Sequence, residues 1–170
     1  MKALYLLRHA KSSWADSGLA DHDRPLAPRG KKATRALALH LAESGVRPAL
    51  VLCSTAARAR ETLDGVVRSL GDDVEVWHER DLYGASAHEL LDRLRRLPPA
   101  VPSVMVVGHN PGMEDLALDI LGGGDQGSLT RLHAKFPTGA LATLLVPGEW
   151  KSLAPGQATL TAYVVPRDLH

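Results

Sequence analysis

Three short segments of this chain are continuously apolar, and they constrain its fold more than any other feature. They cover residues 3–7, 49–53 and 104–107. A strand that is buried on both faces has this pattern, whereas a strand with one solvated face alternates apolar and polar residues. Such strands occur in parallel sheets that helices cover on both sides. The three segments therefore predict an α/β fold.

Helical patterns separate these segments. Apolar residues recur at helical spacing in residues 33–41, 59–70, 87–97 and 113–121. Pro28 and Gly45 are suitable start and stop signals for the first helix, and Ser86 with Glu89 forms a capping box for the third. The glycines at 122–124 are interpreted as the stop of the fourth helix.

Further strands are predicted over residues 74–77, 140–146 and 158–165. The alternation of strands and helices predicts a three-layer α/β/α sandwich with a mostly parallel central sheet. A chain of 170 residues is most simply one domain, so we expect a single domain over residues 1–170.

The composition limits the classes of function. A net charge of +1 gives no basis for binding nucleic acid through overall electrostatics. The single cysteine, Cys53, cannot form an intrachain disulfide and lies in an apolar run, so we expect a buried thiol in a reducing compartment. No apolar run reaches membrane-spanning length, and a predicted strand follows Lys2 directly. These observations favour a cytoplasmic protein that does not contact membranes.

Two of the buried strands end on a histidine. Arg8 and His9 follow residues 3–7, and His109 comes shortly after residues 104–107. In open α/β sheets, ligands bind at the carboxyl ends of the strands. A neutral imidazole can attack phosphorus if an acceptor, such as a backbone carbonyl, holds one ring nitrogen as N–H and leaves the other free. His9 is therefore the candidate nucleophile, and a hydrogen-bonding role at the strand edge is the alternative.

The candidate phosphate ligands are two arginines and the second histidine. Arg8 offers a planar fork that matches phosphate oxygens, and Arg58 follows the second buried strand on the first turn of a helix. Arg60 lies about 200° around that helix from Arg58, so only one can face the pocket, and we expect Arg58 to do so. His109 precedes a helix N-terminus, where it can donate to a phosphoryl oxygen. A surface salt bridge for Arg8 and a solvated position for Arg58 are the alternatives.

Other polar residues have structural interpretations. Ser54 or Thr55 is a candidate cap for the helix that carries Arg58, and Asn110 with Pro111 for the last helix. The remaining histidines show no metal-ligand spacing, and one cysteine excludes the usual zinc patterns. We expect these histidines on the surface or in loops; they are His22, His40, His78, His88, His133 and His170. The sequence therefore predicts an activity without a metal or other cofactor.

The combined motifs resemble those of the histidine phosphatase superfamily, which also includes the cofactor-dependent phosphoglycerate mutases. The pair Arg8-His9 resembles the defining Arg-His pair, Arg58 the second arginine and His109 the second histidine. The short chain, the Arg-His-Ala-Lys-Ser motif and the Asp-Arg-Pro-Leu segment at 23–26 look most like SixA-type phosphohistidine phosphatases. The resemblance implies a phosphoglycerate-mutase-like fold and a phosphohistidine intermediate on His9.

Ala10 and Thr55 stand where many members of the superfamily have glycine and proline, and neither difference changes the chemistry. The general acid matters more. Larger members place a carboxylic acid after the third strand, and Glu79 and Asp81 lie in that region. Neither residue has the spacing along the sequence from Gly84 that is expected of this acid. Each is a candidate acid, and a solvated loop carboxylate is the alternative for each.

The leaving group decides whether such an acid is needed. An ester oxygen leaves badly without a proton, whereas a free imidazole has a pKa of about 6.5 and is easily protonated. A site without a firm acid therefore favours P–N over P–O bonds.

These observations predict a phosphatase that removes phosphate from phosphohistidine on a protein, such as a histidine phosphotransfer domain. One alternative is a phosphatase for small phosphorylated metabolites, such as sugar or nucleotide phosphates. Another is a noncatalytic phosphate-binding module. His9 argues against the last alternative, because phosphate binding needs only the arginines.

Overall fold

A computed structural model describes residues 1–169 and contains one sheet of seven strands within them. The strands are β1 (Lys2–Arg8), β2 (Leu50–Ser54), β3 (Glu75–Glu79), β4 (Ser103–Gly108), β5 (Leu121–Gly124), β6 (Leu141–Val146) and β7 (Ala158–Val164). They follow the order β3-β2-β4-β1-β6-β7-β5. In this part of the chain, four neighbouring pairs are parallel, while β1–β6 and β6–β7 are antiparallel. The prediction of a mostly parallel sheet is confirmed.

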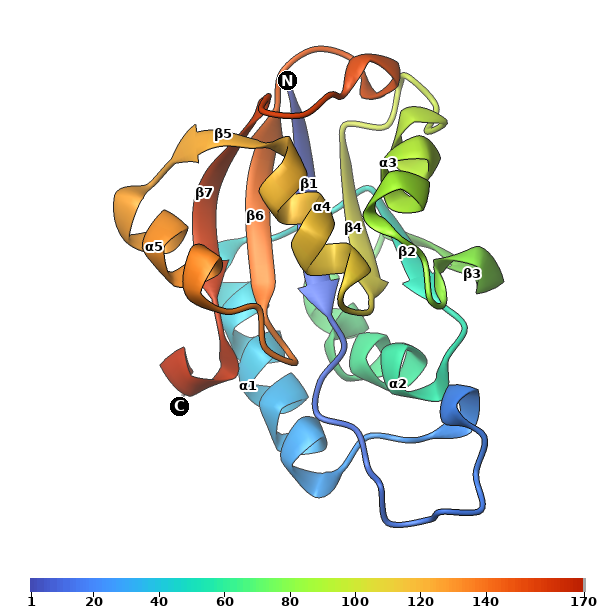
Figure 1. Ribbon diagram of the computed structural model, residues 1–170. Helices are drawn as coiled ribbons and strands as arrows, with labels where there is room; N and C mark the ends of the chain where they lie inside the picture. The colour runs from blue at the N-terminus through green and yellow to red at the C-terminus, as the bar shows by residue number, and fades with distance from the viewer. Residues whose placement is uncertain (170) are drawn as a thin grey trace.

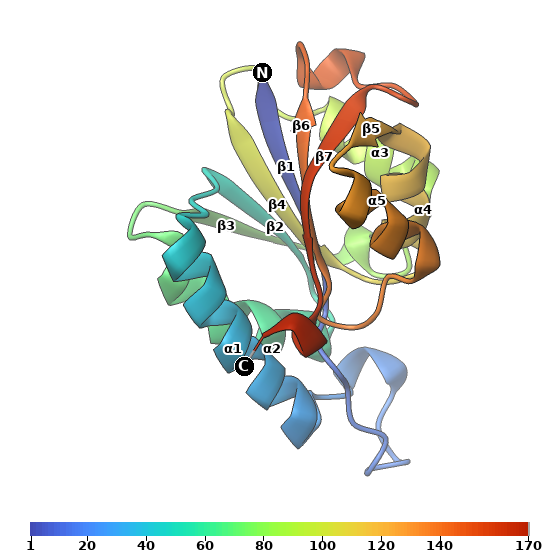
Figure 2. The ribbon, with the colours of Figure 1, turned by 90° about the vertical axis from the view of Figure 1, so that its left-hand side faces the viewer.

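Helices cover both faces of this sheet (Figure 1). They are α1 (Pro28–Ser44), α2 (Ala57–Val66), α3 (Ala87–Arg95), α4 (Gly112–Ile120) and α5 (Gln126–Ala134). Figure 2 shows α1 and α2 on one face and α3, α4 and α5 on the other, which confirms the three-layer sandwich. Within residues 1–169, no helix combines the length and the apolar character needed to cross a membrane.

The strands are apolar at nearly every position because both of their faces are covered. In β1, Leu4 and Leu6 join the core cluster under α3, α4 and α5, whereas Leu7 joins the cluster under α1 and α2. Successive strand side chains point to opposite faces, so a strand between two helical layers buries all of them. Cys53 on β2 is fully buried, as predicted, and its burial raises the pKa of the thiol to about 12.

The predicted helix signals are present in the structure. Helix α1 begins at Pro28 and ends before Gly45, whose φ of 68° is the left-handed conformation that glycine adopts readily. Ser86 and Glu89 form the expected capping box at the start of α3. That helix ends at Arg95, two residues earlier than expected.

One edge of the sheet differs from the prediction. The glycines interpreted as a helix stop lie in β5, which pairs in parallel with β7. A Cβ atom at Gly122 would lie 2.1 Å from the carbonyl oxygen of Gly156, so the close approach of the two backbones requires glycine there. Helix α5, which was not predicted, follows; Asp125 caps it by accepting from the Ser128 N–H.

Candidate active site

The candidate site lies where three adjacent parallel strands end. Strand β1 lies next to β4, which lies next to β2, and Arg8 pairs in register with Gly108. His9 and His109 come directly after β1 and β4, and their ring centroids are 5.2 Å apart. The sheet therefore brings together two histidines that lie about 100 residues apart along the chain.

His9 is held in the tautomer that nucleophilic attack requires. Its Nδ1 lies 2.7 Å from the carbonyl oxygen of Ala10. A carbonyl can only accept, so Nδ1 carries the proton and Nε2 keeps its lone pair. The pKa of His9 is lowered to about 4, chiefly by burial and also by the charges of Arg58 and Arg8, against the opposing effect of the Ala10 hydrogen bond. The imidazole is therefore neutral and nucleophilic near neutral pH.

His109 is arranged as a hydrogen-bond donor. Its Nε2 lies 2.7 Å from the hydroxyl of Ser54, whose oxygen already accepts from the Ala56 N–H. When the Ser54 hydroxyl donates its proton to Nε2, the single N–H of the neutral His109 imidazole lies on Nδ1. Within residues 1–169, this buried Nδ1 has no hydrogen-bond partner, which is unusual outside ligand sites. The pKa of His109 is lowered to about 3, chiefly by burial and then by the charges of His9 and Arg58.

Two arginines complete the site. Arg8 donates from Nη1 to the carbonyl of Phe136 at 3.0 Å, and its buried Nε has no partner within residues 1–169. The Arg58 side chain is only 9% exposed and lies close enough to affect the pKa of both histidines. Arg60, by contrast, is exposed and donates from Nε to the backbone of Thr55. The helix therefore buries Arg58 and exposes Arg60, in the orientation that its geometry predicts.

The sequence analysis did not identify Asp21, a half-exposed acidic residue that pairs with Arg58. The carboxylate of Asp21 accepts from Arg58, Arg24 and the hydroxyl of Tyr83. The Tyr83 hydrogen bond, followed by those of the two arginines, holds the pKa of Asp21 well below its usual range. Asp21 lies two residues before the segment at 23–26 that carries part of the family resemblance, and no sequence pattern marked it.

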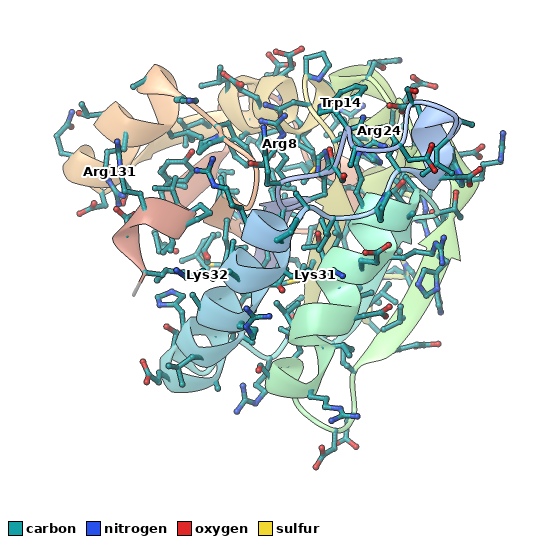
Figure 3. The ribbon with its side chains drawn as sticks, turned by 90° about the horizontal axis from the view of Figure 1, so that it is seen from below. Arg8, Trp14, Arg24, Lys31, Lys32 and Arg131 are labelled. Carbon is teal, nitrogen blue, oxygen red and sulfur yellow. The ribbon has the colours of Figure 1, made fainter. Side chains whose placement is uncertain are left out.

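An exposed tryptophan lies beside the same loop. The guanidinium of Arg24 stacks over the ring of Trp14, with its central carbon 3.3 Å from the ring centroid. Figure 3, which looks onto the carboxyl ends of the parallel strands, shows Trp14 and Arg24 near Arg8. Arg24 also hydrogen bonds to the hydroxyl of Ser12, so the loop is fixed next to the strand that carries Arg8.

His22 lies in the loop between β1 and α1, as expected, but its side chain is half-buried and contacts residues around the site. Its Nε2 is 2.8 Å from the hydroxyl of Thr55, and its ring contacts Tyr83 edge-on, with 4.9 Å between centroids. Tyr83 also packs edge-on against His109. Of the other histidines, His78, His88 and His133 are exposed, His40 is half-buried on α1, and His170 lies outside the described residues. His22 was missed because it follows no strand end and no periodic pattern.

Several short polar side chains make hydrogen bonds around the site. The hydroxyl of Thr62 accepts from the Ala10 N–H at 2.9 Å and donates to the Arg58 carbonyl at 2.7 Å. It therefore links the loop after β1 to helix α2. Ser54 and Thr55 do not cap that helix, because their hydroxyls contact His109 and His22 instead. Asn110 does help to cap α4, since its Oδ1 accepts from the Glu114 N–H.

The candidate acids lie apart from these residues. Arg93 binds both carboxylate oxygens of Glu79, at 2.7 and 2.8 Å, and Asp81 is exposed. Both carboxylates line a cavity of about 920 Å³ that reaches Tyr83 but neither of the two central histidines. Among residues 1–169, no cluster of three or more histidine, cysteine or acidic side chains could hold a metal ion.

The lowered pKa values predict how activity responds to pH. We expect kcat/KM, which reports on the free enzyme, to stay level from about pH 7 to pH 5 and to fall as His9 is protonated near pH 4. A pH profile measured with a phosphohistidine peptide, corrected at each pH for the acid hydrolysis of the peptide without protein, tests this result. A fall in kcat/KM centred near pH 6.5 would contradict it, because that is the value of an ordinary histidine.

Stability should respond to pH in the same direction. Between the ordinary histidine pKa of 6.5 and about 4, the unfolded chain binds protons that folded His9 excludes. The contribution of His9 to the free energy of unfolding therefore decreases as the pH falls through this window. Urea unfolding of the wild type and of His9→Gln at about pH 7 and pH 5 measures that contribution by difference.

The comparisons with known proteins agree with this geometry. A sequence model described as histidine phosphatase superfamily (branch 1) matches residues 4–90. An uncharacterised protein of Mycobacterium tuberculosis is 39% identical over 163 residues, which cover 95% of this chain and all of that protein.

Solved structures give the same relationship. A protein of Nakamurella multipartitia with the provisional name phosphohistidine phosphatase SixA is 31% identical, with a TM-score of 0.81 over 97% of this chain and 96% of its own. A provisionally named SixA of Agrobacterium tumefaciens is 32% identical, with a TM-score of 0.80 over 97% of this chain and 99% of its own. The paired strand-end histidines, the two arginines beside them and these similarities together show that the chain belongs to the histidine phosphatase superfamily.

Proposed function

We propose that the protein is a phosphatase that works through a covalent phosphohistidine on His9. The observation that carries this proposal is the Ala10 carbonyl, which holds the proton on Nδ1 of His9 and keeps Nε2 free. In the first step Nε2 bonds to phosphorus, and the bond from phosphorus to the leaving group breaks. Water then attacks phosphorus, the P–Nε2 bond breaks, and inorganic phosphate leaves neutral His9 behind.

The surrounding residues supply positive charge and hydrogen-bond donors for this transfer. Arg8 and Arg58 provide guanidinium groups, and the Nδ1–H of His109 can donate to a phosphoryl oxygen. Phosphoryl transfer depends mainly on positioning and charge stabilisation, which these groups provide without a metal.

We infer that the substrate is phosphohistidine on a protein. The absence of Glu79 and Asp81 from the group around His9 supports this inference. An imidazole leaving group can take its proton from water before the bond breaks, whereas an ester oxygen needs an enzyme acid. The provisional names of the two SixA relatives also agree with it.

The test compares one P–N and one P–O substrate. We expect the wild type to prefer a phosphohistidine peptide over an alkyl phosphate, because general acid catalysis typically contributes about 10²–10⁴-fold to ester cleavage. Glu79→Gln and Asp81→Asn should change phosphohistidine turnover by no more than about threefold, since no step needs either carboxyl group. Phosphate release under identical conditions measures both rates.

Two outcomes would overturn the substrate assignment. If either variant loses both activities by about 100-fold or more, a general acid is present and the enzyme is better described as a phosphatase for small esters. If the wild type releases no phosphate from either substrate, the noncatalytic phosphate-binding module becomes the better description.

A further inference from the structure

A second cavity, which we call the basic cavity, lies beside the candidate active site. Its volume is about 330 Å³. Every charged side chain among the described residues that line it is a cation, namely Lys11, Arg29, Lys135 and Arg167. Pro137 supplies part of the uncharged wall. The cavity therefore concentrates positive charge, although the whole chain carries a net charge of only +1.

This positive charge is not neutralised within the described part of the chain. None of the four cations forms an ion pair among residues 1–169. Asp168 follows Arg167 directly, but its carboxylate pairs with Arg131 at 2.8 Å. Like charges around one opening repel each other, so an anion placed there lowers the electrostatic energy.

The walls of the basic cavity are the same segments that position the nucleophile. Lys11 lies two residues after His9, and Phe136, between Lys135 and Pro137, accepts the hydrogen bond from Arg8. The N–H of Gly139 lies within hydrogen-bonding distance of the Arg8 and His9 carbonyl oxygens. The segments that line the basic cavity are therefore bonded directly to the residues of the candidate site.

Helix α1 forms a further wall of the basic cavity. A Cβ atom at Gly30 would lie 2.1 Å from the carbonyl oxygen of Lys11, so the start of the helix packs directly on the loop after β1. This contact places Arg29 beside Lys11. Figure 3 also shows Lys32 on the side of α1 that faces the C-terminal segment.

We propose that the basic cavity binds carboxylates of an acidic segment in the phosphoprotein substrate. Its four cations come from separate segments of the chain and surround a partly apolar opening, which suits several carboxylates on a peptide better than one tetrahedral anion. This assignment rests on the proposed function, because it requires a protein substrate. It adds a recognition site outside the phosphoryl pocket.

Binding to an unphosphorylated peptide tests the cavity without turnover. A fluorescent glutamate-rich peptide should bind the wild type at low salt, and Arg29→Glu/Lys135→Glu should weaken binding by about tenfold or more. Arg68→Glu/Lys151→Glu makes the same change in charge at exposed positions outside the cavity and should change binding by no more than about twofold. Circular dichroism confirms that both double variants remain folded.

Activity provides the second test. The wild type should hydrolyse a phosphohistidine peptide flanked by glutamate about tenfold faster, in kcat/KM, than one flanked by glutamine. Arg29→Glu/Lys135→Glu should remove this preference and keep the glutamine-peptide rate. If neither peptide is hydrolysed, the proposed function fails, while the binding result still decides whether the cavity takes an acidic segment.

Three results would overturn the assignment. The first is that Arg29→Glu/Lys135→Glu keeps the preference for the glutamate-flanked peptide. The second is that Arg68→Glu/Lys151→Glu loses as much peptide binding as Arg29→Glu/Lys135→Glu does. The third is that a single-stranded oligonucleotide of equal charge binds more tightly than the glutamate-rich peptide and that Arg29→Glu/Lys135→Glu abolishes this binding. That result would make the cavity a nucleic-acid site.

Discussion

Alanine in place of His9 is expected to lower kcat by about 10⁴-fold or more, because it removes the proposed nucleophile rather than a supporting contact. The fold should persist, since the imidazole lies at the end of β1 and makes one hydrogen bond to a neighbouring backbone carbonyl. Steady-state phosphate release measures the loss, and thermal unfolding measures the fold. A His9→Ala variant with wild-type kcat would exclude covalent catalysis on this residue.

An exposed histidine provides the control for this change. His78 lies on β3, and its side chain is exposed. His78→Ala should leave kcat within about twofold of the wild type, because surface substitutions away from a site have small effects. If both variants lose activity to the same extent, the loss comes from a general property of the preparation and not from the chemistry of His9.

Arg58→Ala is expected to lower kcat/KM by about 10²–10³-fold, the usual cost of removing a buried group that stabilises charge in a transition state. The Arg58 side chain is almost fully buried and lies close enough to both site histidines to lower their pKa values. The change also removes two donors to Asp21, so the variant's thermal unfolding must be measured alongside its rate.

Arg60→Ala is the matched control, because Arg60 lies on the same helix and has the same charge. Its guanidinium donates to the Thr55 backbone from an exposed position, so kcat/KM should stay within about threefold of the wild type. If Arg60→Ala caused the larger loss, the assignment of the two arginines would have to be exchanged.

Much of the site could be predicted from the sequence because its parts follow local rules. Continuous apolar runs marked the buried strands, and the ends of those strands located Arg8, His9 and His109. The geometry of a helix separated Arg58 from Arg60, since two residues turn the chain to the other side. These inferences require only periodicity and the tendency of sites to lie at the carboxyl ends of parallel strands.

The rest depends on contacts between distant segments. Asp21 and Tyr83 meet through a hydrogen bond that joins residues 62 positions apart, and no local pattern marks either residue. Strand β5 is formed largely by glycines, which have a low strand propensity and pair here because the neighbouring backbone approaches closely. His22 reaches the site only through the fold of its loop, which places it against Thr55. Tertiary structure, not local preference, decides each of these positions.

Trapping the phosphoenzyme tests covalent catalysis on His9 most directly. Rapid quenching of the wild type with a labelled phosphohistidine peptide should give a protein-bound phosphate that is stable in base and labile in acid, as a phosphoramidate is. Peptide mapping should place the label on His9, and the His9→Ala protein should carry none. Turnover with no trapped label, or a label on His109 or Asp21 instead, would contradict catalysis through His9.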